Sequence, residues 1–251
     1  MEQSLTNKQT ELKEKFIEER GYWAPIWNGL LELDPEFLEK YLSFSAVPWK
    51  QGYLEPKIKE LIYVAIDVST THLYEPGIRV HMQNALRYGA TKEEIMEVLE
   101  LTSVLGIHTC TVSIPILLAE LEANKKPVSE KLNDRQVQLK EQFIRERGYW
   151  AEIWDGLLRL NPDFLETYLA FSAVPWKHGP LEPKVKELIY VAIDVATTHL
   201  YEPGIKVHMQ NALRYGATKE EIMEVLELTS VLGIHTCTVG VDVLLDELSK
   251  Q

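Results

Sequence analysis

The sequence predicts an all-α protein built from two similar helical units packed together. From residue 9 onward, the chain recurs with a constant offset of 127 residues and no gap. Apolar residues recur at three-and-four spacing, and no stretch shows sustained strand alternation. At 251 residues and 45% hydrophobic content, the chain can bury a sizeable core, and each copy has the size of a small domain. We therefore expect a first repeat at 1–123, a polar linker at 124–135 and a second repeat at 136–251.

Capping and breaking residues place the helices of the first repeat. Asp34, which precedes a proline, suits a helix start, because its side chain accepts from free N–H groups and the proline has none to lose. Pro76 breaks the long central helix, and Thr91 with Glu94 three residues later forms a capping box. Pro115 predicts a kink or a restart in the last helix. In order, the ranges expected to be helical are 11–20, 24–33, 35–47, 56–75, 77–88, 92–102 and 117–122.

Composition excludes several classes of partner. The net charge of −12 argues against a nucleic-acid partner, which would need a basic surface. No unbroken run of about 18 apolar residues exists, so we expect no membrane span. The polar N-terminus lacks the apolar core of a signal peptide. Cys110 and Cys237 occupy one position in each copy, which gives no disulfide framework and fits small buried residues in a reducing cytoplasm.

The two copies differ unevenly along their length. Residues 9–57 and 136–184 differ at 13 of 49 positions, several of them with a change of charge. Residues 58–112 and 185–239 differ at only 3 of 55 positions, and even their polar residues agree. The second stretch is therefore either a functional site or an interface between the copies, unless gene conversion has made it uniform.

Paired histidines are the clearest chemical signal. If the helices on either side of Pro76 form an antiparallel hairpin, His81 comes level with Asp67 and Thr71, near His72. Such a cluster suits acid–base chemistry or a divalent metal, although no zinc signature is present and core histidines would give the same pattern. Six of the seven histidines recur between the copies, as His72/His199, His81/His208 and His108/His235.

Residues 57–106 resemble the carboxymuconolactone decarboxylase family, whose fold is shared with alkylhydroperoxidase D. The resemblance is carried by K-x-x-E-L-I at the start, by H-x-x-x-A-L-x-x-G-A-T-x-E-E-I from His81, and by the leucine-rich helix that follows. It implies an all-helical fold in which two units pack around a shared site. Members commonly form trimers or hexamers, so the resemblance implies a pseudo-dimeric chain that assembles as a homotrimer.

The peroxidase branch of that family works with a glutamate, a Cys-x-x-Cys pair and a histidine. Allowing a two-residue insertion, these fall in that order on Glu60, His72, near Glu75 and on His81, and in the second repeat on Glu187, His199, near Glu202 and on His208. Both thiols are absent, so the resemblance does not extend to dithiol peroxidase activity. Glu60 lies twelve residues before His72, about 18 Å along a straight helix. It would therefore meet the returning helix or another unit, or else Asp67 orients the histidine and the glutamate role does not transfer.

The decarboxylase branch, which lacks the thiol pair, suits this sequence better. It implies acid–base chemistry on a small organic acid or lactone, with Glu60, His72 and His81 as catalytic residues together with Glu187, His199 and His208. Arg79 and Lys206 keep a positive charge at one position and are candidates for binding a substrate carboxylate, unless they are solvated helix charges. No cofactor is required by this interpretation. One alternative is a metal-dependent enzyme with His72, His81, His199 and His208 as ligands, and another is a non-catalytic oligomeric binding protein.

Overall fold

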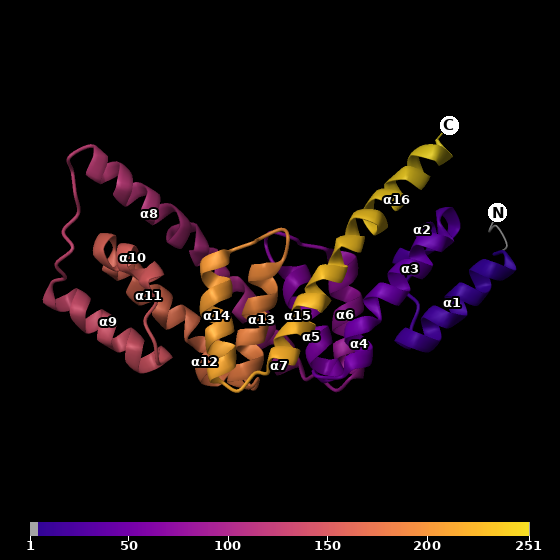
Figure 1. Cartoon of the computed structure of the whole chain (residues 1–251), viewed down its shortest axis with the longest axis horizontal. Helices are drawn as coiled ribbons and strands as arrows, with labels where there is room; N and C mark the ends of the chain where they lie inside the picture. The colour runs from indigo at the N-terminus through magenta and orange to yellow at the C-terminus, as the bar shows by residue number, and fades with distance from the viewer. Residues whose placement is uncertain (1–4, 251) are drawn as a thin grey trace.

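A computed structural model describes residues 5–250, which are helical with no β-strand among them (Figure 1). The elements of the first repeat are α1 (Asn7–Arg20), η1 (Pro25–Trp27), α2 (Asn28–Leu33), α3 (Pro35–Ser45), α4 (Val47–Gln51), α5 (Pro56–Val68), α6 (Glu75–Arg87), α7 (Lys92–Ser103), η2 (Val104–Ile107) and α8 (His108–Ala123). Those of the second repeat are α9 (Asp134–Arg147), η3 (Glu152–Trp154), α10 (Asp155–Leu160), α11 (Pro162–Ser172), α12 (Val174–His178), α13 (Pro183–Val195), α14 (Glu202–Arg214), α15 (Lys219–Ser230), η4 (Val231–Ile234) and α16 (His235–Ser249). Element order is the same in both repeats, so the all-α tandem architecture is confirmed.

Local sequence signals explain most helix ends, and two prolines behave differently from expectation. The Asp34 cap and the Thr91 capping box form as predicted. Pro76 does not break the central helix: α5 has already ended at Val68, and Pro76 occupies the first turn of α6, where a missing N–H is harmless. Pro115 lies inside a continuous α8, and the irregularity comes earlier, as the 3-10 turn η2.

The core lies between the repeats, where α5 and α13 pack against each other and against α7 and α15. Most side chains of α5 and α13 are buried, which explains their apolar sequences. Because equivalent helices of the two repeats meet, the chain folds as a pseudo-dimer with an isologous interface.

Buried ion pairs cross this interface in both directions. Lys59 Nζ lies 2.7 Å from Glu224 Oε1, and both side chains are at most 2% exposed. Lys186 and Glu97 form the reciprocal pair at 2.6 Å. The second oxygen of Glu224 accepts a hydrogen bond from the backbone of Leu54 at 2.6 Å. Each pair is hydrogen-bonded on more than one side, as charges removed from water must be.

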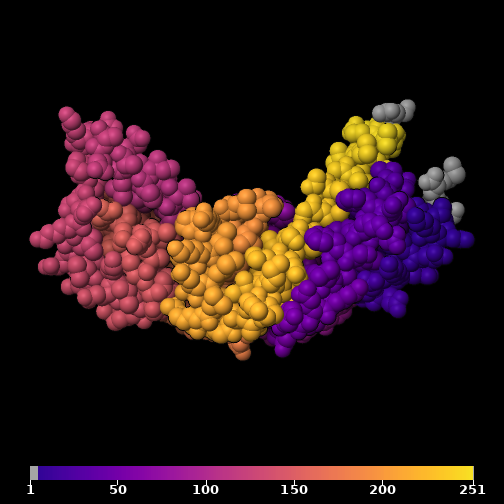
Figure 2. Space-filling model, viewed as in Figure 1, coloured from indigo at the N-terminus to yellow at the C-terminus, as the bar shows by residue number. Residues whose placement is uncertain are grey.

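The last helix of each repeat packs against the other repeat. α8 lies along α10, and α16 lies along α2 (Figure 1). Figure 2 shows the C-terminal segment, in yellow, lying against the surface of the first repeat. Glycines allow the close approach: a Cβ on Gly29 would come within 2.7 Å of Val241, and one on Gly156 within 2.5 Å of Ile114. Each repeat thus packs its last helix against the other repeat, and this exchange brings the first turns of α8 and α16 toward the opposite repeat.

Two continuous helical stretches, 92–123 and 219–249, have the length and composition of a membrane span. Neither stretch is an unbroken apolar run, because a hydropathy window tolerates the polar residues that interrupt one, and the expectation of no membrane span stays a prediction. Packing accounts for part of the apolar composition, since 39% of each window is buried and the α7 and α15 portions belong to the central core.

Candidate functional site

The contact between α5 and α6 places Glu60 against His81. Glu60 is 1% exposed, and its Oε2 lies 2.6 Å from His81 Nδ1. Tyr63, on the same face of α5, packs its ring 4.5 Å from the imidazole. Burial opposes a charge on His81, but the Glu60 carboxylate and its hydrogen bond outweigh burial and raise the histidine pKa. Glu60 holds Nδ1 of His81, so Nε2 is the ring nitrogen that can exchange a proton with another group.

Asp67 lies two turns further along α5 and is fully buried. Neither of its carboxylate oxygens has a hydrogen-bond partner among the described residues. Burial raises the Asp67 pKa to about 7, although the nearby His81 opposes this rise. A Cβ on Gly77, in the first turn of α6, would come within 2.1 Å of Asp67 Oδ2, so only glycine leaves room for the carboxylate there.

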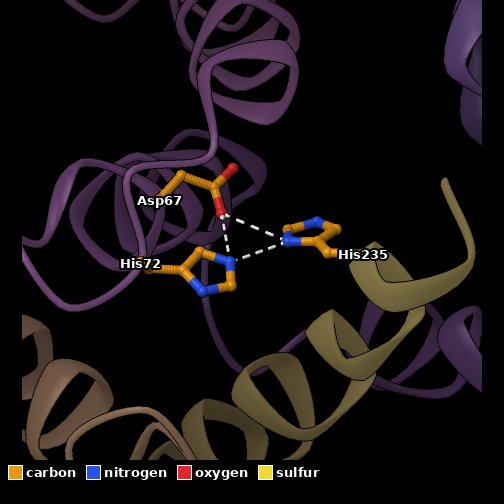
Figure 3. A group of neighbouring side chains, drawn as sticks. All are labelled: Asp67, His72 and His235. Carbon is orange, nitrogen blue, oxygen red and sulfur yellow. Dashed lines mark hydrogen bonds and ion pairs between the residues drawn. The ribbon is translucent and has the colours of Figure 1, made fainter. Parts of the chain in front are cut away.

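His72 follows α5 in the turn before α6 and meets a histidine of the other repeat. Its Nε2 lies 2.8 Å from Nδ1 of His235, the first residue of α16. Asp67 Oδ1 completes a triangle with these nitrogens, at 3.6 Å from His72 and 3.7 Å from His235 (Figure 3). Burial, followed by the neighbouring histidines, lowers the His235 pKa to about 3. The cluster of Asp67, His72 and His235 therefore exists only because α16 reaches the first repeat.

Tyr74 fixes the orientation of the imported histidine. Its ring stacks on His235 at 3.9 Å between centroids, and its hydroxyl lies 2.6 Å from Thr238 Oγ1. Thr238 in turn donates a hydrogen bond to the His235 carbonyl. Stacking of the Tyr74 ring on His235 and the contact of its hydroxyl with Thr238 together hold the first turn of α16.

The second repeat repeats this arrangement. His208 Nδ1 lies 2.6 Å from Glu187 Oε2, as in the first repeat. His199 Nε2 lies 2.9 Å from Nδ1 of His108, which α8 brings from the first repeat. Asp194 Oδ1 is 3.7 Å from both nitrogens. Its other oxygen lies 4.0 Å from His208 Nε2, so the aspartate connects the histidine pair with the glutamate–histidine pair.

A cavity opens beside each cluster. The first, of about 50 Å³, is lined by Glu60 and His81 of one repeat and by His235 of the other. The second, of about 70 Å³, is lined by the equivalent residues. Aromatic side chains form much of both walls. One half-buried arginine enters each cavity, Arg20 or Arg147, and no other arginine or lysine of the described chain lines either one.

Comparison with known proteins shows the family of the chain. The model of the carboxymuconolactone decarboxylase family matches residues 35–106 and 162–233. The chain belongs to the carboxymuconolactone decarboxylase family. A crystal structure of a protein from Burkholderia xenovorans LB400, provisionally assigned as a gamma-carboxymuconolactone decarboxylase subunit, is 44% identical over 98% of this chain and 99% of that one, with a TM-score of 0.93. No protein of curated function matched the chain.

The site of this family member unites some of the residues predicted from the sequence. Glu60 contacts His81, which resolves the distance problem along α5, because the returning helix brings the partner. His72 lies near Asp67 as expected, but its closest imidazole is His235. Thr71 takes no part, since it is exposed and paired with Ser69. The unassigned pair His108 and His235 supplies the cross-repeat half of both clusters.

Two other expectations do not agree with the geometry. Arg79 is exposed and pairs with Glu75 four residues away. Lys206 is exposed and lines a separate pocket beside Trp150, so neither residue lines the cavity beside a cluster. His72 and His81 do not share a described group of metal-compatible spacing. The described groups with metal-compatible spacing are instead Asp67, His72 and His235, and Asp194, His199 and His108.

The sequence reasoning missed the cavity arginines. Arg20 and Arg147 precede Gly-Tyr-Trp in both copies, within a stretch where neighbouring charges change, as at Glu18 and Arg145. The two copies keep an arginine at this position while the neighbouring charges change, and this agreement could have indicated a functional arginine. Arg20 and Arg147 lie on the charged helices α1 and α9, which made them resemble solvated surface residues.

Proposed function

We propose that the chain is an acid–base enzyme of decarboxylase or lactone type, acting on a small organic acid at two equivalent sites. The observation that carries the proposal is the hydrogen-bonded pair of Glu60 and His81 in a small, largely aromatic cavity that also holds Arg20. In one cavity, a proton donor can supply the proton that replaces carbon dioxide, and a fixed cation can hold a substrate carboxylate.

Arg20 is the proposed carboxylate-binding residue. A guanidinium presents parallel N–H groups that match a carboxylate, and the surrounding low dielectric strengthens the interaction. Arg20 Cζ lies 5.4 Å from the centroid of the Trp49 ring, and the guanidinium donates to Ser45, so its position is fixed before a ligand arrives. Arg147 has the same surroundings in the second cavity.

His81 is the proposed general acid. Its Nδ1 is held by Glu60, which stabilises the imidazolium, so Nε2 remains to deliver a proton to the carbon that loses carbon dioxide. The electron pair of the broken carbon–carbon bond takes that proton. In a lactone reaction the same nitrogen would protonate or deprotonate oxygen. His208 with Glu187 has the same role in the second site.

A dithiol mechanism has no support in the arrangement of the thiols. Histidines and glutamates occupy the positions where that mechanism needs cysteines. Cys110 packs with the outer apolar cluster of the second repeat, and Cys237 with that of the first. The two sulfurs therefore lie in different apolar clusters, an arrangement that does not favour an attacking and a resolving thiol in one site.

Paired substitutions test the assignment. Small mono- and dicarboxylic acids and their lactones are screened by thermal shift, and turnover of each binder is followed by carbon dioxide release and proton NMR. We expect His81→Gln with His208→Gln to lower kcat about 100- to 10,000-fold with little change in KM. Arg20→Gln with Arg147→Gln should instead raise KM, and Arg79→Gln with Lys206→Gln should change neither.

The outcomes separate this proposal from its alternatives. Ligand binding without turnover in the unmodified chain, undiminished by the histidine substitutions, would show a binding protein. Loss of stability and assembly with no effect on binding or turnover would show that the histidines are structural.

For the assembly, we propose a homotrimer in the cytoplasm. Support comes from the family resemblance, from the unpaired Cys110 and Cys237, and from exposed apolar side chains such as Phe44, Phe171 and Ile116. Light scattering after gel filtration should give three times the chain mass of 28.9 kDa. A mass equal to one chain would contradict the trimer without affecting the proposed chemistry.

A further inference from the structure

The proposed role of the glutamate–histidine pair does not explain the buried carboxylate of Asp67. Its carboxylate is fully buried, and within residues 5–250 neither oxygen has a hydrogen-bond partner. The distances from Oδ1 to His72 Nε2 and His235 Nδ1, 3.6 and 3.7 Å, are too long for hydrogen bonds. A buried carboxylate without partners is destabilising by several kcal/mol. Asp194 repeats this state in the other half of the molecule.

We propose that Asp67, His72 and His235 bind a divalent transition-metal ion of the zinc type, and that Asp194, His199 and His108 bind a second one. Two imidazole nitrogens and one carboxylate oxygen are a ligand set for zinc and related first-row ions that leaves a coordination position open. The aspartate that lacks a partner then has one, and it neutralises half of the ionic charge.

The spacing of the donor atoms fits such an ion. Ligands about 2.0–2.1 Å from a tetrahedral zinc lie roughly 3.3–3.4 Å from each other. In the first cluster the separations are 2.8, 3.6 and 3.7 Å (Figure 3). In the second they are 2.9, 3.7 and 3.7 Å. An ion would replace the shared proton between the histidines and require them to separate by about half an ångström, while the aspartate moves closer.

Neighbouring side chains hold the ligands in this geometry. Tyr74 stacks on His235 and bonds to Thr238, which fixes the imported imidazole. The absence of a side chain at Gly77 leaves the space that the Asp67 carboxylate occupies. Supporting contacts of this kind set the orientation of metal ligands and commonly change affinity 10- to 100-fold when removed.

Access to the cluster is available from two sides. A pocket of about 60 Å³ reaches His72 between the repeats, and His235 also lines the cavity that contains Arg20. An ion could therefore enter without unfolding, and its open position would adjoin the cavity. The inference rests on the ligand geometry and does not depend on the proposed acid–base function.

Metal content of the full chain, purified without an affinity tag, tests the proposal. After treatment with a chelator and its removal, the chain is titrated with zinc in competition with a chromophoric chelator, and with cobalt to report the coordination geometry. We expect about two ions per chain, one for each cluster. Uptake below about a tenth of an ion per chain would overturn the proposal whether or not the protein is an enzyme.

The exchange between repeats supplies a matched control. His72→Gln with His235→Gln removes two ligands from one cluster, so one ion should remain. His72→Gln with His108→Gln removes the same number of imidazoles but affects both clusters, so both ions should be lost. His178→Gln, at an exposed unpaired histidine, should retain both. Equal retention in the two double variants would refute the cross-repeat ligand sets, and circular dichroism verifies that each variant is folded.

Discussion

Replacing both buried aspartates by asparagine should change how stability depends on pH. Burial raises the Asp67 pKa from 3.8 to about 7, and the Asp194 pKa likewise. Between these values the unfolded chain releases a proton that the metal-free folded chain keeps, so the unfolded state binds fewer protons and stability falls as pH rises. One pKa unit corresponds to about 1.4 kcal/mol, so the loss approaches roughly 4 kcal/mol for each aspartate by neutral pH.

Neighbouring histidines titrate over the same range and must be separated from this effect. Burial lowers the pKa of His235 and of His108 to about 3, so their contribution to stability rises with pH between about 3 and 6.5. His81 has a raised pKa, and its contribution is lost as pH rises through that value. The informative quantity is therefore the difference between variant and unmodified chain, in which much of the histidine contribution cancels.

Urea unfolding in the presence of a chelator, from pH 4.5 to 7.5, measures this difference. Asp67→Asn with Asp194→Asn should gain stability relative to the unmodified chain as pH rises, by several kcal/mol across the range. Asp163→Asn, at an exposed position, serves as the control for loss of a surface carboxylate. A flat difference for the double variant, within about 1 kcal/mol, would mean that the buried aspartates are already ionised at pH 4.5, and the reasoning from burial would be refuted.

Three further outcomes follow from the packing. Lys59→Met should destabilise the chain by about 3–5 kcal/mol, because Glu224 is left buried without its cation, and Lys59→Met with Glu224→Gln should recover much of that loss in denaturant unfolding. Gly77→Ala should destabilise by about 1–3 kcal/mol, since the new methyl group meets the Asp67 carboxylate, whereas Gly106→Ala, which faces open space, should have almost no such effect on the melting temperature. Tyr74→Phe should lower metal affinity about 10- to 100-fold in the chelator competition, because the hydroxyl no longer holds Thr238 and the His235 helix end; unchanged affinity would leave only ring stacking as the orienting contact.

Helix positions were largely predictable because their signals are local. A capping box such as Thr91 with Glu94 acts over three residues, and apolar spacing along α5 reports burial directly. Rise per residue excluded a contact of Glu60 with His72 within one helix, but it left open whether the partner of Glu60 comes from the returning helix, as it does, or from another unit. Pro76 was misjudged because a proline at a helix start and one at a helix end look alike until the preceding turn is known.

The composition of the site could be predicted only in part, because its decisive contacts are long-range. The apolar pattern blurs around His108 and His235, and nothing local shows that the helix beginning at His235 crosses to the other repeat and meets His72, 163 residues earlier. Exposure of Arg79 depends on the direction in which α6 faces, and the burial of Arg20 on how α1 packs. Neither is contained in a local pattern.

The near identity of 58–112 and 185–239 has a physical reason in this exchange. Each repeat contributes to both candidate sites: His72 lies in the cluster of its own repeat, and His108 lies in the cluster of the other. The same stretch supplies Lys59 and Glu97, each a partner in an ion pair across the interface. A site and an interface were competing explanations for the agreement between the copies. In this fold each candidate site contains residues of both repeats, so it is also part of the interface between them. A change in either copy alters a contact that spans both, so the two copies of this stretch cannot diverge independently without disturbing a site or the packing between the repeats.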